Sequence, residues 1–520
     1  AEARYNLGIA YTTLQRWDLA IASYQAVIKL NPHHTGAVAN LTRLLHDPAA
    51  VAKCNDRALV ETAFALHQQG HLEIATSLYQ AALLIRPDNF NALHMLGVLA
   101  IQNNDDKKAC TLIEQAVAIR PDDAEARYNL GIAYVALQQW DLAITHYQIA
   151  MRINPQHAGA AYNLGCLFKD RQQLVAAVAC YDDALRAKPN WADAYWNKSL
   201  TLLLGGQFDP GWRLYEWRWQ IECLKNSSQR FLEKDLWLGE SALAGKTLLL
   251  HTEQGMGDSL HFCRYAPLLS RLGAQLVLEV DRPLVTIMQS LDGVARVIEK
   301  GQALPAFDYH CPMMSLPLAF KTFSESDIPS QVPYLFAPPN KMRAWHERLG
   351  AKSKLRVGVV WSSGVHPEQE PALAIKAARR HLPFSLLAHL NHPDIEFYSL
   401  QKGERAESTL VADKKQYWVG NNFHVFTDQL HDFSDTAALI MQLDLIISVC
   451  TSVPHLAGAL GKTTWLLLPF SADWRWLLDR EDSPWYPSLR LFRQPQEGDW
   501  ESVIAKVGVA LTETLKTFAR

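Results

Sequence analysis

The chain has 520 residues, 49 % of them hydrophobic and 20 % charged, which is typical of a globular protein with about three or four structural units. Fifty basic and 53 acidic side chains give a formal net charge of −3, so we expect no nucleic-acid partner and no polybasic membrane surface. No apolar run reaches the roughly 18 residues that a transmembrane helix requires, so no membrane span is expected.

The eight cysteines are widely spaced, and the closest two, Cys166 and Cys180, are 14 residues apart. This spacing contains no CxxC metal or redox motif. Scattered cysteines in a long chain are typical of reduced thiols, so we expect a cytoplasmic protein.

Residues 1–220 contain a repeat with a period of 34 residues. The segment AEARYNLGIAY occurs at 1–11 and again at 124–134. The period of 34 residues separates Pro87, Pro121, Pro155 and Pro189. This pattern resembles the tetratricopeptide repeat (TPR), which implies pairs of antiparallel helices stacked as a solenoid with a capping repeat at its end. The repeat is in phase at residue 1, which predicts further repeats before it. A step of 21 residues between the repeats that begin near 35 and 56 predicts one shortened repeat.

An asparagine recurs at the sixth position of several repeats. Its amide can donate to and accept from a peptide backbone, so a row of them would bind an extended polypeptide. Peptide O-GlcNAc transferases carry such a row, and this arrangement resembles theirs. The alternative is that asparagine is simply common at this position of TPRs. We predict an acceptor-peptide site at Asn40, Asn129, Asn163 and Asn197.

Six of the 16 tryptophans fall between residues 191 and 237. This cluster follows the last complete repeat and precedes a change in pattern. We therefore expect residues 221–243 to form a linker, with the tryptophans packing the solenoid against the domain that follows.

Beyond residue 243, short β-branched and leucine-rich runs alternate with helical stretches, which predicts buried parallel strands. The runs are 247–251, 275–280, 355–361, 395–401, 445–449 and 464–468. They form two groups, which predicts two Rossmann-like domains at 244–345 and 352–498, followed by a C-terminal helix at 499–520. The expected fold class is therefore α plus α/β: a solenoid followed by a two-domain body with its ligand at the carboxyl ends of the strands.

Segments 248–269 and 445–469 resemble the ADP-heptose:lipopolysaccharide heptosyltransferase family, which has the GT-B architecture. Together with 473–487, they make the chain similar to bacterial TPR-containing glycosyltransferases. The resemblance implies an inverting transferase that uses a nucleotide-diphosphate sugar and needs neither a metal nor another cofactor. The solenoid implies a polypeptide acceptor.

The first group of strands carries the predicted general base. In the family, the aspartate of a Gly-Asp pair after the first strand takes the proton of the acceptor hydroxyl, and Gly257 and Asp258 match that pair. The alternative for Asp258 is a purely structural helix cap. His261 and Arg264 lie one turn later. Their position would allow them to face the cleft, and the alternative for each is a structural role.

The second group supplies the predicted nucleotide-sugar site. Thr451, Ser452 and His455 begin a helix whose free N–H groups would bind the diphosphate. The family pattern has an aspartate where this chain has Cys450, so the identity of the donor sugar stays open. Further contacts are predicted from residues that follow two other strands: Ser362, Ser363 and Gln401 toward the nucleotide, and Arg380 toward the departing diphosphate.

The main hypothesis is therefore a metal-independent glycosyltransferase that modifies a protein hydroxyl. Two alternatives remain open. One is a TPR scaffold with a degenerate transferase body, suggested by Cys450, and the other is a heptosyltransferase-like enzyme with a glycan or lipid acceptor.

Overall fold

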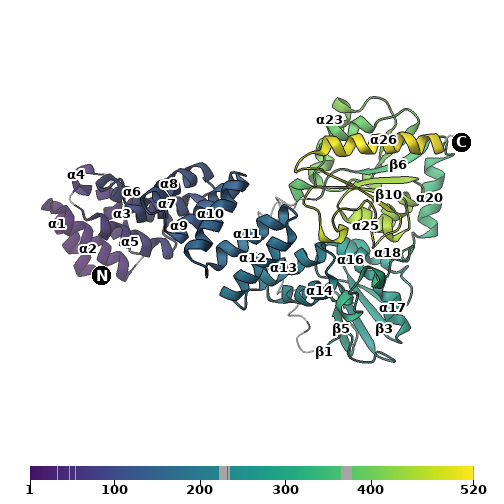
Figure 1. Ribbon diagram of the computed structural model, residues 1–520, viewed down its shortest axis with the longest axis horizontal. Helices are drawn as coiled ribbons and strands as arrows, with labels where there is room; N and C mark the ends of the chain where they lie inside the picture. The colour runs from purple at the N-terminus through teal and green to yellow at the C-terminus, as the bar shows by residue number, and fades with distance from the viewer. Residues whose placement is uncertain are drawn as a thin grey trace. The chain divides into compact units, whose positions relative to one another are not determined.

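The computed structural model describes residues 1–31, 33–45, 47–52, 54–221, 231, 235–364 and 377–518 (Figure 1). Most of the predicted linker, residues 222–230 and 232–234, lies outside this described part. The chain divides into two compact units, Ala1–Ala194 and Tyr195–Arg520. Residues 195–220, which the repeat pattern assigned to the solenoid, thus belong to the second unit.

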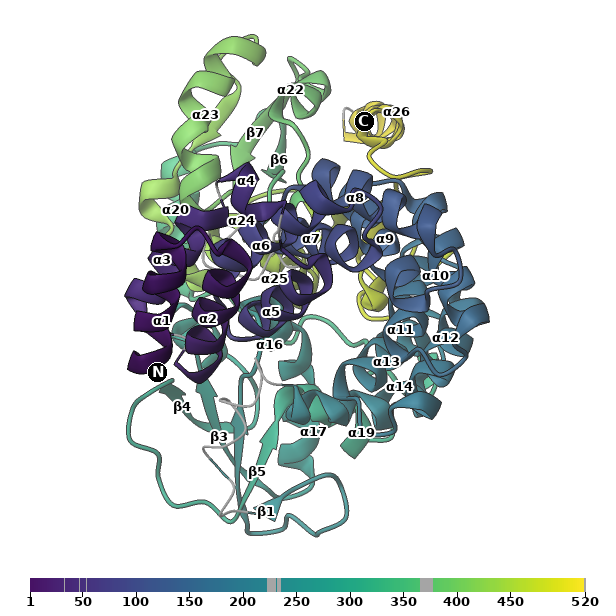
Figure 2. The ribbon, with the colours of Figure 1, turned by 90° about the vertical axis from the view of Figure 1, so that its left-hand side faces the viewer.

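The first unit consists of consecutive antiparallel helix pairs, which lie side by side in Figure 2. The short helix α4, only four residues long, is the shortened repeat that the sequence predicts. The pairs are α1 (Glu2–Thr13) with α2 (Trp17–Leu30), α3 (Thr35–Leu45) with α4 (Pro48–Val51), α5 (Asp56–Gln68) with α6 (Leu72–Ile85), α7 (Phe90–Gln102) with α8 (Asp106–Ile119), α9 (Ala124–Ala136) with α10 (Trp140–Ile153), and α11 (Ala158–Asp170) with α12 (Leu174–Ala187).

Small residues explain why the two helices of a pair approach closely. A Cβ atom at Gly131 would lie 2.5 Å from the ring of Tyr147, and one at Gly165 would lie 2.8 Å from the ring of Tyr181. Real atoms do not approach so closely, so only glycine leaves room for the buried tyrosine of the second helix. The recurrent glycine and tyrosine of the sequence pattern are therefore packing partners.

The second unit begins with a helical segment and a five-stranded parallel sheet, β1-β5-β2-β3-β4. Helix α13 (Ala192–Leu204) crosses the boundary between the units. The strands are β1 (Asp235–Leu236), β2 (Thr247–His251), β3 (Gln275–Val280), β4 (Val294–Glu299) and β5 (Tyr309–Pro312). The helical elements are α14 (Phe208–Tyr215), η1 (Glu216–Gln220), α16 (Met256–Phe262), η3 (Cys263–Tyr265), α17 (Ala266–Arg271), η4 (Arg282–Leu284), α18 (Val285–Met288), η5 (Met313–Ser315), α19 (Leu316–Ala319) and η6 (Glu325–Asp327).

A second parallel sheet has the strand order β11-β10-β9-β6-β7-β8. Its strands are β6 (Leu355–Val360), β7 (Ile395–Ser399), β8 (Phe423–Val425), β9 (Leu445–Val449), β10 (Thr464–Leu468) and β11 (Leu489–Arg493). Helix α26 (Trp500–Phe518) buries Trp500, Val503 and Val507 in the core of this sheet. The other helices are α20 (Pro339–Leu349), α22 (Phe384–Leu387), η7 (Ala388–Leu390), α23 (Glu404–Tyr417), η8 (Thr427–Gln429), α24 (Phe433–Met441), α25 (Ser452–Ala459) and η9 (Trp474–Trp476).

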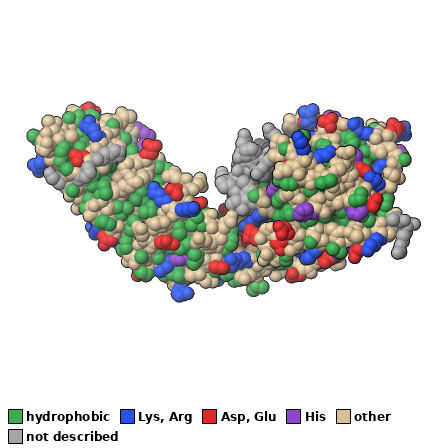
Figure 3. All heavy atoms as spheres, turned by 90° about the horizontal axis from the view of Figure 1, so that it is seen from above, with side chains coloured by type: hydrophobic (Ala, Val, Ile, Leu, Met, Phe, Trp, Pro, Cys, Tyr) green, Lys and Arg blue, Asp and Glu red, His purple; other side chains and the backbone are tan. Residues whose placement is uncertain are grey.

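The two parallel sheets confirm the α plus α/β fold class. All six predicted strand segments are strands, although two of them end one or two residues earlier than predicted. Within the described ranges, no helix combines the length and apolar character needed to cross a membrane. On the face shown in Figure 3, basic and acidic side chains are interspersed, as the small net charge predicts.

The segment after α14 is anchored in the first sheet by a buried cation. Arg218 is 1 % exposed, and its Nε donates to Glu253 at 2.8 Å, while its Nη1 donates to Glu216 at 2.7 Å. The hydroxyl of Ser315 lies 2.6 Å from Nη2. Because Glu253 lies in the loop between β2 and α16, Arg218 holds the start of that loop in place.

Candidate functional site

The two α/β halves of the second unit meet where helices α16 and α25 begin, each just after the carboxyl end of a strand. Figure 1 shows these helices beside each other between the two sheets. A Cβ atom at Gly257 would lie 3.2 Å from Cδ2 of His455 and 3.4 Å from Cα of Ser452. The structure therefore brings together the predicted base segment and the predicted diphosphate segment, and Gly257 makes the approach possible.

Asp258 lies at this junction and has two partners. Its Oδ2 accepts the N–H of Gly255, the N-cap residue, at 2.9 Å, so the Asp258 side chain caps the start of α16 from the third helical position. Its Oδ1 pairs with Nη2 of Arg475, from the other half. The carboxylate is 22 % exposed. Asp258 thus caps its helix, as the structural alternative predicts, and it also lies at the junction, as the catalytic hypothesis requires.

Arg475 is the central cation of the junction. Its Nη1 donates to Asp473 at 2.8 Å, and its guanidinium lies 4.3 Å from the ring centroid of Trp474. The side chain is 7 % exposed, and its Nε has no hydrogen-bond partner among the described residues. Burial alone would raise the pKa of Asp473, but the charges of Arg475 and Arg380 outweigh it and lower that pKa to about 2. Asp473 is therefore a permanent anion.

Tyr486 joins the two helices beneath this ion pair. Its hydroxyl lies 3.0 Å from Nδ1 of His261 on α16 and 3.1 Å from Nδ1 of His455 on α25. Burial, reinforced by Arg475, lowers the pKa of His455 to about 3, and burial with the charge of Arg264 lowers that of His261 well below its usual value. Both imidazoles are therefore neutral at physiological pH.

This arrangement gives His261 and Arg264 the structural role that the sequence left open. They are 0 % and 3 % exposed, so they do not face an open cleft. The guanidinium of Arg264 lies 4.3 Å from the ring centroid of Tyr486 and donates to the carbonyl of Trp485 at 2.6 Å. Both residues belong to the packed interface between the halves.

The predicted diphosphate residues lie at the start of α25. Thr451 is the N-cap and accepts the N–H of Val453 at 3.3 Å, while Ser452 is partly exposed. Cys450 is buried, and its Sγ accepts the indole N–H of Trp476 at 3.2 Å. Burial raises the pKa of the Cys450 thiol even though Arg380 is near. Cys450 is therefore uncharged and cannot replace the carboxylate that the family pattern has at this position.

Two of the other predicted nucleotide contacts, one after β6 and one after β7, bond to each other. The Oε1 of Gln401 accepts the N–H of Ser362 at 2.9 Å, and its Nε2 donates to the carbonyl of the same residue at 3.0 Å. Gln401 is 2 % exposed, so its amide positions the loop after β6. Ser363 is partly exposed and donates to the carbonyl of Ala377 at 3.1 Å.

Arg380 reaches the same region from the segment before α22. It is partly buried, and its positive charge contributes to the pKa shifts of Cys450, His455 and Asp473. Arg380 and Arg475 therefore place two positive charges near the start of α25, as stabilisation of a leaving diphosphate would require.

The predicted asparagines lie on α3, α9, α11 and α13, so the row skips α5 and α7, and the amides on α3, α9 and α11 bond side chains of the solenoid. Nδ2 of Asn40 donates to the hydroxyl of Tyr5 at 3.4 Å, and Nδ2 of Asn163 donates to that of Tyr147 at 3.3 Å. Asn129 lies 2.9 Å from Nε2 of His94. Asn197 has an intermediate exposure. The row thus has a structural role inside the solenoid, and its role in peptide binding stays a prediction.

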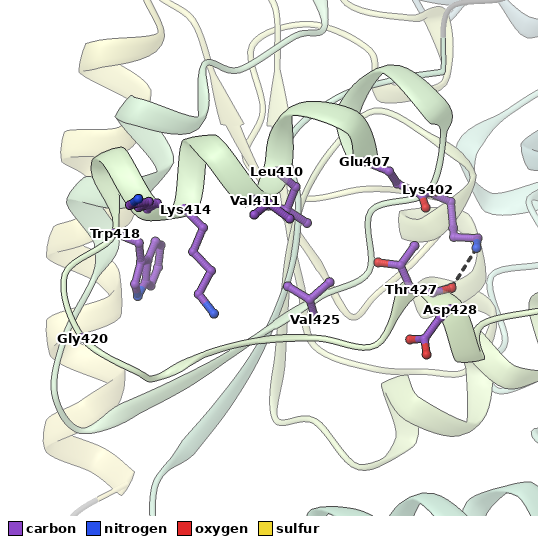
Figure 4. A pocket seen from close by; sticks show the side chains of 11 residues that line it. Lys402, Glu407, Leu410, Val411, Lys414, Trp418, Gly420, Val425, Thr427 and Asp428 are labelled. Carbon is purple, nitrogen blue, oxygen red and sulfur yellow. Dashed lines mark hydrogen bonds between the residues drawn. The ribbon is translucent and has the colours of Figure 1, made fainter.

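A cavity of about 700 Å³ lies between α23 and edge strand β8 and contains none of the predicted site residues (Figure 4). Lys402 donates to the carbonyl of Thr427 at 2.8 Å, and Lys414 donates to that of Phe423 at 2.7 Å. These ammonium groups cover the two ends of an exposed strand edge, which protects that edge from pairing with another chain.

Sequence reasoning missed Asp473, Arg475 and Tyr486, although the segment 473–487 was singled out for its resemblance and its aromatic residues. The signal available was the Asp-x-Arg pair that begins five residues after the end of the predicted strand 464–468, at the edge where ligands bind in such sheets. The pairing of Arg475 with Asp258 is invisible in the sequence because 217 residues separate them.

Comparison with known proteins identifies the repeats. Tetratricopeptide repeat family models match residues 1–34, 63–124 and 124–157. The N-terminal unit is a TPR solenoid. Such repeats bind peptide segments of other proteins, so this unit is a protein-interaction scaffold.

One curated relative is protein FlbA of Caulobacter vibrioides, which is 28 % identical over 341 residues. The match covers 61 % of this chain and 54 % of FlbA, so the chain spans about half the length of that relative. Similar solved structures cover about a third of the chain. A crystal structure of MamA is 23 % identical, covers 32 % of this chain and 95 % of MamA, and has a TM-score of 0.29. YrrB, described as a TPR protein with an unusual peptide-binding site, is 21 % identical, covers 33 % and 90 %, and has a TM-score of 0.29.

Proposed function

We propose that the protein is a glycosyltransferase that moves a sugar from a nucleotide-diphosphate sugar to a hydroxyl of a polypeptide bound by the TPR solenoid. The observation that carries this proposal is the contact of Gly257 with Ser452 and His455. It sets a carboxylate of one α/β half, Asp258, beside a helix N-terminus of the other. A base and an anion-binding helix end are the two groups that such a transfer needs.

In the proposed reaction, Asp258 accepts the proton of the acceptor hydroxyl as its oxygen attacks the anomeric carbon. A new C–O bond forms on one face of the sugar, and the C–O bond to the diphosphate breaks on the opposite face, so the configuration inverts. The nucleoside diphosphate leaves with the electron pair. Arg380 and the first N–H groups of α25 supply the positive potential that stabilises it.

Binding of a nucleoside diphosphate tests the proposal. Calorimetry of the full chain with ADP, GDP and UDP is expected to show one of them binding at micromolar concentration, on the order of −8 kcal/mol. Arg380→Gln is expected to weaken that binding about tenfold, because it removes one charge-assisted contact worth about 1.5 kcal/mol. Arg490→Gln is the matched control, since Arg490 is 48 % exposed on β11 and pairs with Glu481.

One observation favours a second candidate function. Cys450 replaces the acidic residue that is expected to contact the donor sugar, and its uncharged, buried thiol bonds Trp476. A chain that has lost donor recognition would act as a TPR scaffold alone. In that case none of the three nucleotides binds, and the glycosyltransferase proposal fails. If a nucleotide binds and sugar transfer occurs only to a glycan or lipid, the polypeptide acceptor is excluded.

A further inference from the structure

Asp258, the proposed base, is engaged on both of its oxygens. Oδ2 accepts the N–H of Gly255 at 2.9 Å, and Oδ1 pairs with Arg475. Both carboxylate oxygens therefore already have a donor, and Oδ1 can accept the proton of a hydroxyl only after its guanidinium partner moves away. The structure therefore shows this base in a restrained state.

The restraining cation has other anions to bind. Arg475 keeps Asp473 on Nη1 at 2.8 Å, so its charge stays compensated if Asp258 leaves. Its Nε is buried and has no partner among the described residues, which is a costly state for a guanidinium donor. The next residue, Trp476, stacks on His455 with ring centroids 5.3 Å apart and donates to Cys450. Arg475 therefore lies close to the start of α25.

We propose that Arg475 is a positioning residue that pairs with Asp258 until a diphosphate binds, and that the diphosphate and the Asp258 carboxylate compete for this guanidinium. The inference rests on the proposed function and adds an order of substrate binding to it. The donor substrate binds first and draws the Nη2 group of Arg475 away from Oδ1, which frees Asp258 to accept the proton of the acceptor hydroxyl. Without a donor, the base stays paired.

The alternative is a static clamp in which the Asp258–Arg475 pair only holds the two α/β halves together. The two ideas differ in the sign of one effect. If the pair competes with the diphosphate, removing the charge of Asp258 releases Arg475 and tightens diphosphate binding. If the pair is a clamp, removing that charge loosens the junction and leaves diphosphate binding unchanged or weaker.

A double-mutant cycle on the full chain separates them, with inorganic pyrophosphate as the probe, because it requires no knowledge of the base or the sugar. Asp258→Asn is expected to tighten pyrophosphate binding about tenfold, which is within the usual range of coupling between sites. Arg475→Met is expected to weaken it, and Asp258→Asn is expected to have no effect in the Arg475→Met background. Arg475→Lys is expected to restore part of the affinity, since it restores the charge.

Asp258→Gln guards against misfolding, because a glutamine at the third helical position can still accept the N–H of Gly255 but carries no charge. It is expected to tighten binding as Asp258→Asn does. Pyrophosphate that binds wild type but binds neither variant more tightly would overturn this inference and leave the proposed function intact. Absence of binding of pyrophosphate and of ADP, GDP and UDP to every variant would overturn both.

Discussion

Arg475 and Asp258, 217 residues apart in the sequence, form an ion pair that joins the two α/β halves of the second unit. The pair lies beside the start of α25, where Gly257 meets Ser452 and His455. Its partners come from the two elements that the proposed transferase reaction would use, one for the acceptor and one for the donor. Several measurable consequences follow from this junction.

Replacing the proposed base is expected to reduce sugar transfer strongly without preventing nucleotide binding. Asp258→Asn is expected to reduce sugar transfer by about 100-fold or more, the usual contribution of a general base, while nucleoside diphosphate binding is retained or tightened. Transfer rates and calorimetric dissociation constants check this. Asp292→Asn, at an exposed position, is the control and is expected to behave as wild type. Unchanged turnover in Asp258→Asn would remove Asp258 from this role.

Tyr486 is expected to stabilise the junction through its hydroxyl. Tyr486→Phe leaves two buried imidazole nitrogens, Nδ1 of His261 and Nδ1 of His455, without their shared partner. We expect a loss of about 1–3 kcal/mol in the free energy of unfolding, measured by denaturant titration with tryptophan fluorescence. Tyr417→Phe, at a tyrosine that is 41 % exposed, is the matched control. Equal stability of the two variants would contradict the account.

The buried histidines predict that the second unit loses stability in acid. The pKa of His455 is about 3 in the folded protein, because of burial and then Arg475, whereas an unfolded histidine has a pKa of about 6.5. Between these values the unfolded chain binds the additional proton, so stability falls as pH drops from about 6.5 toward 3.

His455→Gln is expected to reduce this slope by about 1 kcal/mol per pH unit, since glutamine does not take up the proton. Denaturant midpoints of wild type and variant at several pH values between 7 and 4, followed by tryptophan fluorescence, measure it. His261, whose pKa is also lowered, keeps part of the slope in the variant. If the stability of wild type and of the variant falls with the same slope as the pH is lowered, His455 does not take up a proton on unfolding.

Substitutions in the asparagine row are expected to weaken binding of the polypeptide acceptor and to leave binding of the nucleotide donor unchanged. Substituting Asn129 and Asn163 together by alanine is expected to raise KM for a polypeptide acceptor about tenfold, because each amide offers a backbone contact worth about 0.5–1.5 kcal/mol. The affinity for the nucleoside diphosphate is expected to stay the same. Asn154→Ala changes an exposed asparagine that caps a loop N–H at 3.0 Å, and serves as the control.

The sequence predicted the regular helices and strands well, because the spacing of apolar residues along the chain reflects which side chains pack in the core. The 34-residue repeat gave the helix pairs, and continuous apolar runs located β2, β3, β6, β7, β9 and β10. It did not locate the strands β1, β4, β5, β8 and β11. Strand β4, for example, is not a continuous apolar run, because the charged residues Arg296 and Glu299 lie within it.

The candidate site was only partly predictable. Gly257, Asp258, Ser452 and His455 do converge, because each pair follows the carboxyl end of a strand in its own sheet and helices α16 and α25 pack against each other. The orientation of α16 was not predictable. Gly257, His261 and Arg264 are spaced four and three residues apart and so share one helix face. That face packs against the second half instead of lining a cleft, a tertiary contact that no local pattern reports.

Sugar transfer to a protein is tested most directly by intact-mass spectrometry of a purified acceptor protein. The account predicts that an acceptor incubated with the full chain and a panel of nucleotide sugars gains the mass of a hexose, a heptose or a related sugar. It also predicts that Asp258→Asn gives no such gain. An acceptor whose mass stays unchanged across every nucleotide sugar, while its binding to the solenoid persists, would contradict the account and leave the protein as a scaffold.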